Sequence, residues 1–487
     1  MNRDHPITVN FKGGIISPGQ LREILGIAEE CLIKEVCFGS RQQLLIDVPE
    51  RYFSLFTTHC KKNQIHFEET KKAHANITSS YVSAGIFTTD SWLTEGTYKD
   101  VLNMFEQPSR FKINICDSRQ TFTPFFTGHL NWITASQLHY WHLYLRMPGS
   151  NELYKWPEEI YTNYIGTLST RIEKQLTAGT KTTKGEDIYK QLRTGEQTGS
   201  NSNAASIAVP KFHLPYYEGF NRHGNSYWLG IYRRDESFPV AFLQELCDLC
   251  LETKIGQLYS TAWKSLIIKD IDPAYRQRYD YILNKYRINV RHAANELNWQ
   301  LEDSNDEALR IKRLVIRHFD KEDVRTYGLS FGIQLKQRAG IFGSVIIRKC
   351  PQTGSGRLRS QERYDILHTS DFNPNSQDLV AFREGVSKEY LGTYLVSLSK
   401  YFYEQMEAQH VPNILSNPEP IKKTEEKTWH QCPECFTVYD EALGDPAQNI
   451  APNTAFENLT SSYCCTMCGE PVANFVSRNE LKVSPAL

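Results

Sequence analysis

The sequence predicts an α+β protein in which an α/β sandwich occurs twice and a small, separate, metal-stapled domain follows. Three observations support this fold class. Strand and helix patterns alternate over residues 7–65, the same order returns over residues 227–287, and two C-x-x-C pairs stand near the C-terminus. Alternating strands and helices favour mixed sandwiches, and repetition at this distance indicates duplicated domains rather than a solenoid.

The first copy reads as a strand, a helix, two strands and a second helix. The strand is ITVNF, and the helix is SPGQLREILGIAEECLI, in which Ser17 is a suitable N-cap and Pro18 a suitable first residue. The strands EVCFGS and QQLLIDV and the helix PERYFSLFTTHCKKN follow. The second copy repeats this order from YWLGIYR to DPAYRQRYDYILNKY, and Leu44-Leu45-Ile46 aligns with LII about 222 positions later.

Composition divides the chain into five segments. Residues 1–174 and 209–409 are the two halves of the large part, and residues 175–208, rich in Gly, Thr, Ser, Asn and Lys, are predicted to form a flexible loop between them. Residues 410–428 carry proline and alternating charge, which is typical of a semi-extended linker. Residues 429–487 are therefore predicted to be a tethered domain.

Composition and charge narrow the classes of function. The chain has 487 residues, 40% of them hydrophobic, and a formal net charge of −1. Such a chain can bury a core, and its balanced charge gives no sign of a nucleic-acid partner. No apolar run approaches the roughly 18 residues of a membrane span, and the N-terminus lacks the apolar core of a secretory signal. We expect a cytoplasmic protein.

The 12 cysteines of such a chain should be reduced, and paired ones are more often metal ligands than disulfides. Cys432 and Cys435 form one C-x-x-C pair, and Cys465 and Cys468 form another. Two such pairs supply a tetrahedral set of four sulfurs, which suits iron or zinc. A domain this short also needs such a metal in order to fold.

The sequence around these pairs resembles the rubredoxin family over residues 429–475. The matching positions are Tyr439, Asp440, Gly444, Asp445, Pro446, Ile450, Pro452, Thr454, Phe456 and Leu459. The resemblance implies one iron ion, held by the four cysteines, that alternates between its ferrous and ferric forms and passes single electrons. The alternative is a zinc ribbon, in which the metal is structural only.

Two positions depart from the rubredoxin pattern. Phe436 stands where the family usually has glycine after the second cysteine, and Thr466 stands where it usually has proline after the third. Because only glycine adopts positive φ freely, we expect Phe436 to strain the turn that directs a backbone N–H at sulfur. A shifted reduction potential would follow.

The large part resembles the sirohaem nitrite and sulfite reductases. Its segment FKGGIISPGQ…LLIDVP is similar to the ferredoxin-like repeat of that family, with Ser40-Arg41-Gln42 at the place of a T-R-Q-like turn. PSRFKINI is similar to the family's P-R-K-F-K-I segment. The resemblance implies two ferredoxin-like halves, and it implies that Arg41, Arg110 and Lys112 bind the carboxylates of a tetrapyrrole or an anionic substrate.

One feature of that family is missing. Its [4Fe–4S] cluster is held by cysteines spaced C-x5-C and C-x3-C in the second half, but residues 289–320 contain no cysteine and Cys350 stands alone. We therefore expect no [4Fe–4S] cluster, and an electron carrier rather than an autonomous nitrite or sulfite reductase.

We predict an iron-binding, one-electron transfer protein whose large part is a docking body, active in nitrate, nitrite or sulfite assimilation. Its partners would be redox proteins, namely a nitrate or nitrite reductase and an upstream reductase. One alternative is a reductase that binds sirohaem or another tetrapyrrole and receives electrons from its own rubredoxin iron. A second alternative is a zinc-stapled scaffold.

Two other clusters are predicted to be structural. Cys247 and Cys250 lie three residues apart in a helix with an apolar face, so core packing is favoured over metal binding. The segment with His129, His139 and His142 includes a histidine pair three residues apart, and it is predicted to be a packed, aromatic-rich helix without a ligand role.

Overall fold

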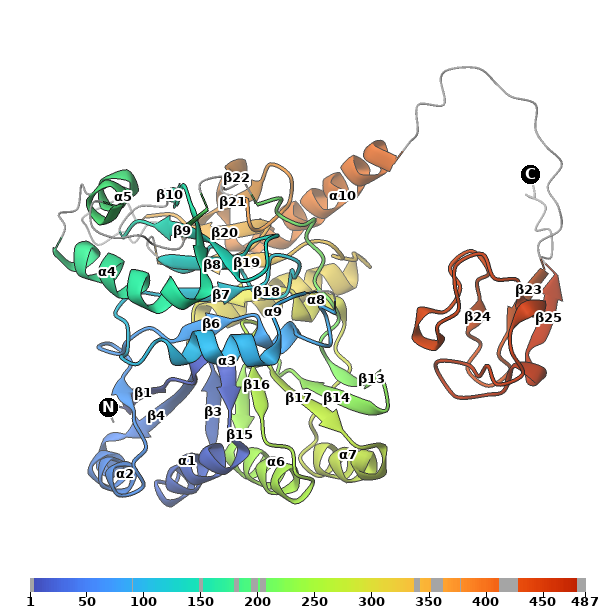
Figure 1. Cartoon of the computed structure of the whole chain (residues 1–487), viewed down its shortest axis with the longest axis horizontal. Helices are drawn as coiled ribbons and strands as arrows, with labels where there is room; N and C mark the ends of the chain where they lie inside the picture. Colours follow the sequence, from blue (N-terminus) through green and yellow to red (C-terminus); the bar gives the residue numbers. More distant parts are fainter. Residues whose placement is uncertain are drawn as a thin grey trace. The chain divides into compact units, whose positions relative to one another are not determined.

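The computed structural model describes residues 4–89, 91–148, 152–178, 184–193, 200–201, 207–336, 342–351, 362–376, 378–410 and 428–479. The chain divides into two compact units, Met1–Ala408 and Gln409–Leu487 (Figure 1). In the part of the chain that the structure describes, no helix has both the length and the apolar character needed to cross a bilayer.

The first layer of the large unit consists of two antiparallel five-stranded sheets, with helices side by side along it (Figure 1). One sheet has the order β15 (Ser237–Pro239), β3 (Glu35–Phe38), β4 (Leu44–Pro49), β1 (Asp4–Val9), β5 (Glu68–Glu69). The other has the order β13 (Gly219–His223), β14 (Ser226–Ile231), β17 (Leu266–Ile271), β16 (Leu258–Ser260), β2 (Ile15–Ile16). The helices are α1 (Pro18–Glu30), α2 (Glu50–Lys62), α6 (Val240–Glu252) and α7 (Arg276–Lys285).

Each half of the large unit lends a short strand to the sheet of the other half. Strand β2 of the first half pairs with β16 of the second, with Ile16 opposite Leu258. Strand β15 of the second half pairs with β3 of the first, with Phe238 opposite Val36. Buried residues of both halves also share one hydrophobic core. The two predicted halves are therefore interlocked.

Backbone conformation supports the internal repeat. Leu32 and Gln42 have positive φ values of 57° and 62°, and Lys254 and Lys264, each 222 positions later, have 61° and 56°. Residues with a Cβ seldom adopt this conformation. Its recurrence at the same two places in each copy therefore indicates that the turns are equivalent, as the alignment of the LLI and LII strands predicts.

A second layer repeats another arrangement in both halves. In the first half, β6 (Ile77–Ser79), β7 (Ile113–Cys116) and β8 (Leu130–Thr134) are parallel neighbours, and β8 pairs with antiparallel β9 (Tyr140–Arg146). In the second half, the parallel neighbours β18 (Trp299–Leu301), β19 (Phe331–Gln334) and β20 (Val345–Lys349) precede antiparallel β21 (Arg363–Thr369).

The remaining elements of the large unit extend or cover these two sheets. The strands are β10 (Leu153–Lys155), β11 (Glu159–Tyr161), β12 (Ser200–Asn201) and β22 (Leu379–Ser387). The helices are α3 (Glu95–Asn103), α4 (Ile165–Ala178), α5 (Gly185–Arg193), α8 (Ala294–Leu297), α9 (Asp306–Lys321) and α10 (Leu391–His410).

Two expectations about secondary structure are wrong. His142 lies in strand β9 and His139 just before it, not on a helix. The five central residues of β9 are all buried, so the strand lacks the alternation that would have identified it. Helix α5 lies within residues 175–208, which were expected to form a loop. Glu186 and Lys190 pair on successive turns of α5.

The remaining predictions concern two cysteines, the loop, the linker and the C-terminal domain. Cys247 and Cys250 are fully buried in the shared core, as expected from the apolar face of their helix. Residues 411–427, which make up most of the predicted linker, lie outside the described residues, as do residues 179–183, 194–199 and 202–206 of the predicted loop. In the small unit, β23 (Thr428–Gln431) pairs with β24 (Val438–Tyr439) and with β25 (Val476–Asn479).

Candidate metal centre

Two matching turns hold the four cysteines of the small unit. In the turn at residues 432–436, the amide of Phe436 donates to the carbonyl of Cys432 at 3.1 Å, and the amide of Cys432 donates to the carbonyl of Thr437 at 2.9 Å. The turn at residues 465–469 repeats both hydrogen bonds, at 2.8 and 2.7 Å. Each turn brings its two sulfurs to the same side.

The four sulfurs form one cluster. Cys432 Sγ lies 3.4 Å from Cys468 Sγ, Cys435 Sγ lies 3.4 Å from Cys465 Sγ, and all four atoms lie within 4.8 Å of one another. These separations are much longer than a disulfide bond of about 2.05 Å. They are close to the edge of about 3.8 Å in a tetrahedron whose metal–sulfur bonds measure about 2.3 Å. The donor set fits a single iron or zinc ion.

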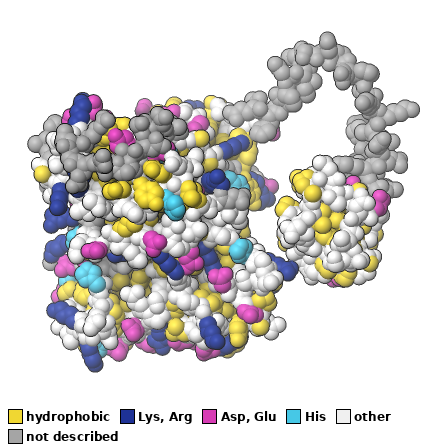
Figure 2. All heavy atoms as spheres, viewed as in Figure 1, with side chains coloured by type: hydrophobic (Ala, Val, Ile, Leu, Met, Phe, Trp, Pro, Cys, Tyr) yellow, Lys and Arg dark blue, Asp and Glu magenta, His cyan; other side chains and the backbone are white. Residues whose placement is uncertain are grey.

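The two ligand pairs have one buried and one accessible sulfur each. Cys432 and Cys465 are 0% and 2% exposed, whereas Cys435 is half-buried and Cys468 is exposed. The inner cysteines can therefore anchor a metal, while the outer ones leave one edge of the site within reach of a partner. Hydrophobic side chains reach the surface of this unit (Figure 2). They include Phe436 and Met467, which are 64% and 75% exposed.

Phe436 takes the left-handed conformation that its position demands. Its φ is 61°, and Gly469, at the matching place in the other turn, has a φ of 81°.

Hydrogen bonds from the Thr437 hydroxyl and backbone lower the pKa of Cys435 to about 6, which favours its ligating thiolate form.

An aromatic core supports the two turns. The ring of His430 stacks on Phe456 with centroids 3.8 Å apart, and Tyr439 and Tyr463 meet at 5.8 Å. The hydroxyl of Tyr463 donates to Asp445 Oδ2 at 3.0 Å. A Cβ on Gly444 would lie 2.4 Å from the carbonyl oxygen of Ala451, so this position excludes side chains. These contacts show why the aromatic residues, Asp445 and Gly444 occur at their positions between and beside the two cysteine pairs.

Known proteins share this arrangement. A family model described as Rubredoxin matches residues 429–475. The chain is also 50% identical over 40 residues to Probable Rubredoxin-2 of Methanocaldococcus jannaschii, a match that covers 8% of this chain and 71% of that protein. Through its C-terminal unit, the chain belongs to the rubredoxin family. The rubredoxin domain indicates one iron ion in the four-cysteine site and a role in electron transfer.

In two other relatives, the matched segment is only a small part of the protein. Rubredoxin-2 of Alcanivorax borkumensis is 40% identical over 55 residues, which is 11% of this chain and 31% of that protein. Rubredoxin-1 of Pseudomonas putida is 41% identical over 49 residues, which is 10% of this chain and 28% of that protein. The chain therefore spans about a third or less of the length of these two relatives.

The large unit has a counterpart among solved structures. The structure titled "Structure of Mycobacterium tuberculosis NirA protein" superposes with a TM-score of 0.61 over 82% of this chain and 81% of that one, at 12% sequence identity. Identity this low shows the fold alone. The likeness confirms the predicted α+β fold class of the body that precedes the rubredoxin domain.

Arg41 is tied to the backbone of the large unit. Its Nη2 donates to the carbonyls of Asn76 and Ile113 at 2.7 and 2.8 Å, its Nε donates to Asn76, and its Nη1 donates to Asn114 Oδ1 at 3.1 Å. Burial lowers its pKa to about 10, so it stays charged at neutral pH. At least four of its five N–H groups therefore bind protein oxygens.

Lys112 belongs to a group that the sequence does not reveal. It precedes β7, His129 precedes β8 and Arg146 ends β9, so these three residues, the strand-end cluster, lie at one end of three adjacent strands. The Lys112 amide donates to His129 Nδ1 at 2.9 Å, and the Arg146 amide donates to the His129 carbonyl at 2.8 Å. Arg110, by contrast, is exposed and lines a pocket of about 670 Å³ beside α4, which Lys112 does not line.

The positive charges in and beside the strand-end cluster repel one another. Burial, then Arg41 and Arg146, lower the pKa of Lys112 to about 8. Burial, then Lys112 and Arg41, lower the pKa of His129 to about 4, so this ring is neutral at pH 7. The equivalent strand ends of the second half carry Ser330, Ser344 and Thr369, which have no charge.

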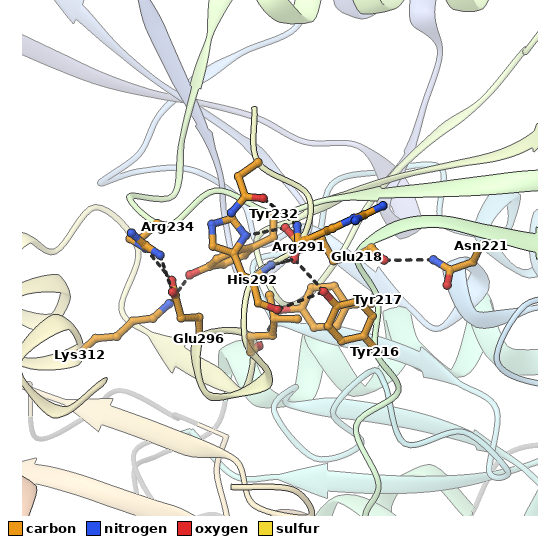
Figure 3. A network of polar contacts seen from close by, with 12 residues as sticks. Tyr216, Tyr217, Glu218, Asn221, Tyr232, Arg234, Arg291, His292, Glu296 and Lys312 are labelled. Atoms are coloured by element: carbon orange, nitrogen blue, oxygen red, sulfur yellow. Dashed lines mark hydrogen bonds and ion pairs between the residues drawn. The ribbon is translucent and has the colours of Figure 1, made fainter. Parts of the chain in front are cut away.

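The segment without cluster cysteines is held by a polar network (Figure 3). The Glu218 carboxylate accepts hydrogen bonds from the backbone amide and Nδ1 of His292, both at 2.6 Å, and its side chain is fully buried. Arg234 binds Glu296 through two hydrogen bonds. This network is not placed to bind a metal. Among the described residues, only the four cysteines of the rubredoxin domain bring three or more His, Cys, Asp or Glu side chains close enough together to hold a metal ion.

Proposed function

We propose that the chain carries single electrons through its rubredoxin domain, and that the large unit selects the protein with which it exchanges them. The observation that carries this proposal is the cluster of four sulfurs, two inside the domain and two at its surface. Iron in this set supplies one-electron chemistry between its ferrous and ferric forms. Cys432 and Cys465 would anchor it, and Cys435 and Cys468 would face the partner.

The fold of the large unit supports a role in the assimilation of nitrate, nitrite or sulfite. Its fold resembles that of NirA, and its residues 289–320 offer no cysteine for a second iron centre. A body of this fold suits docking to a nitrate or nitrite reductase, with an upstream reductase as electron donor. Attachment of a carrier to its docking surface raises the local concentration, to roughly millimolar for a short flexible tether.

The test is a reductive titration of the purified full chain, followed by mixing with a purified nitrite reductase. We expect the visible absorption of the loaded protein to bleach with one electron equivalent and to return on oxidation. The reduced chain should then reduce the nitrite reductase faster than the Cys465→Ser variant does. A protein that takes up no electron would overturn the carrier role. A rate equal to that of the variant would overturn the choice of partner.

A second candidate function is the binding of an anion, or of the carboxylates of a tetrapyrrole such as sirohaem, by the large unit. The strand-end cluster favours it, because the positive charge of Arg146 lowers the affinity of Lys112 for protons and an anion would relieve that repulsion. The equivalent strand ends of the second half carry neutral serines, so only the first half has positive charge at this place. Arg41, whose donors are largely occupied, would act mainly by holding the neighbouring strands.

A further inference from the structure

The iron site has a side-chain donor beside one of its ligands. Thr437 Oγ1 lies 3.1 Å from Cys435 Sγ, a hydrogen-bonding distance. The backbone amide of Thr437 is also directed at this sulfur. Thr437 is half-buried, as is Cys435, so solvent competes only partly for the hydroxyl group.

The matching turn shows how this pair differs. Two residues after Cys468, the backbone amide of Glu470 is directed at the Cys468 sulfur, as that of Thr437 is at Cys435. The Glu470 side chain, however, accepts a hydrogen bond from Asn474 Nδ2. A carboxylate has no proton to offer a thiolate, so the backbone donor is common to both turns and the hydroxyl donor is added only at Cys435.

We propose that the Thr437 hydroxyl donates a hydrogen bond to the Cys435 thiolate of the iron-loaded domain and thereby raises the reduction potential of the iron site. A thiolate ligand carries no proton, so the hydroxyl must be the donor. When the site gains one electron from a reductant and no proton, its net negative charge rises by one. The hydrogen bond then becomes stronger, because the acceptor is more negative. The reduced form gains more stability than the oxidised form, so the potential rises.

The experiment compares three full-length chains loaded with iron: the unchanged protein, Thr437→Val and Thr437→Ser. Valine keeps the shape of threonine and removes the donor, and serine keeps the donor and removes the methyl group. Spectroelectrochemical titration against redox dyes gives each potential, and iron content per chain confirms that each site is filled. Thr437→Ala provides a second donor-free chain if the valine variant does not load iron.

We expect the valine and alanine variants to be reduced with an equilibrium constant lower by up to about tenfold, which is about 59 mV for one electron. The serine variant should keep the potential of the unchanged protein. An unchanged potential in the donor-free variants, or an equal fall in the serine variant, would overturn the role of the hydroxyl. Because this inference rests on the proposed iron function, an unchanged chain that holds zinc and takes up no electron would overturn both.

Discussion

Phe436 shows how one residue can carry a local cost within the rubredoxin domain. Its φ of 61° is unfavourable for any residue with a Cβ, by roughly 1–2 kcal/mol. The residue is 64% exposed, so packing contributes little in return. The unusual residue was visible in the sequence as a departure from the glycine of the family, and the structure shows the conformation that makes it costly.

Replacing Phe436 with glycine should therefore stabilise the rubredoxin domain by about 1 kcal/mol. The measurement is the denaturant concentration at which the iron absorption of the full chain is half lost, which should rise. Gly469→Ala, at the matching position with a φ of 81°, should lower it. A fall in the Phe436→Gly variant would mean that the exposed ring makes a stabilising contact.

Lys112 gives the large unit a predicted pH dependence. Its folded pKa of about 8 lies below the unfolded value of about 10.4, so its charge costs stability below pH 8, and that cost is lost as the pH rises from about 8 to about 10. An anion can compensate only the protonated lysine. We expect nitrite, whose charge is constant in this range, to raise the melting temperature at pH 7 and to lose this effect as the pH passes through about 8.

The Lys112→Met variant tests the same residue without a change of pH. It should melt at a higher temperature than the unchanged chain when no anion is present, and nitrite should no longer stabilise it. Lys174→Met is the matched control, because Lys174 is an exposed lysine of α4 outside the strand-end cluster. Stabilisation by nitrite that survives in Lys112→Met would rule the strand-end cluster out as the anion site.

At the scale of elements, the sequence predicts best where periodicity and end signals agree. Helix α1 begins at Pro18 after the N-cap Ser17, whose side chain accepts from Gln20, as the sequence predicts. Strand β9 was missed because its buried central residues do not alternate. The exchanged strands β2 and β15 have two and three residues, too few to show any period, and their partners lie in the other half.

The exchanged strands should make the large unit unfold as one. Phe238 of β15 is fully buried and meets Phe38 of β3 edge to face at 5.2 Å. Phe238→Ala should lower the free energy of unfolding of the large unit by about 3–5 kcal/mol. Leu251→Ala, at a half-exposed position of the adjacent helix α6, should change it far less. Calorimetry that resolves separate transitions for the two halves would contradict the interlocked arrangement.

At the scale of the whole molecule, the two sites differ in how far the sequence reveals them. The four iron ligands lie in two C-x-x-C pairs, so local spacing identifies them. Lys112, His129 and Arg146 are separated by 17 positions at each step, and only the pairing of β7, β8 and β9 brings them to one end of a sheet. Resemblance to a family pointed to Lys112, and His129 stood out only as one of three neighbouring histidines. No sequence signal pointed to Arg146 or placed the three residues together.

The division into two units predicts independent unfolding. Cys465→Ser removes a buried ligand, so the rubredoxin domain should lose its iron and its folded structure. The large unit has its own core clusters and should keep the melting temperature that it has in the unchanged chain. A large unit that melts together with the variant rubredoxin domain would show that the units depend on each other.

The metal content and absorption spectrum of the purified full chain test the central claim most directly. The account predicts one iron ion per chain and the sulfur-to-iron charge-transfer bands of a four-cysteine site. It predicts no Soret band, because the proposed carrier uses the iron of the rubredoxin domain and no tetrapyrrole. A colourless protein with one zinc ion per chain would contradict electron transfer. A Soret band would instead show a tetrapyrrole in the large unit and favour a reductase that receives electrons from its own rubredoxin domain.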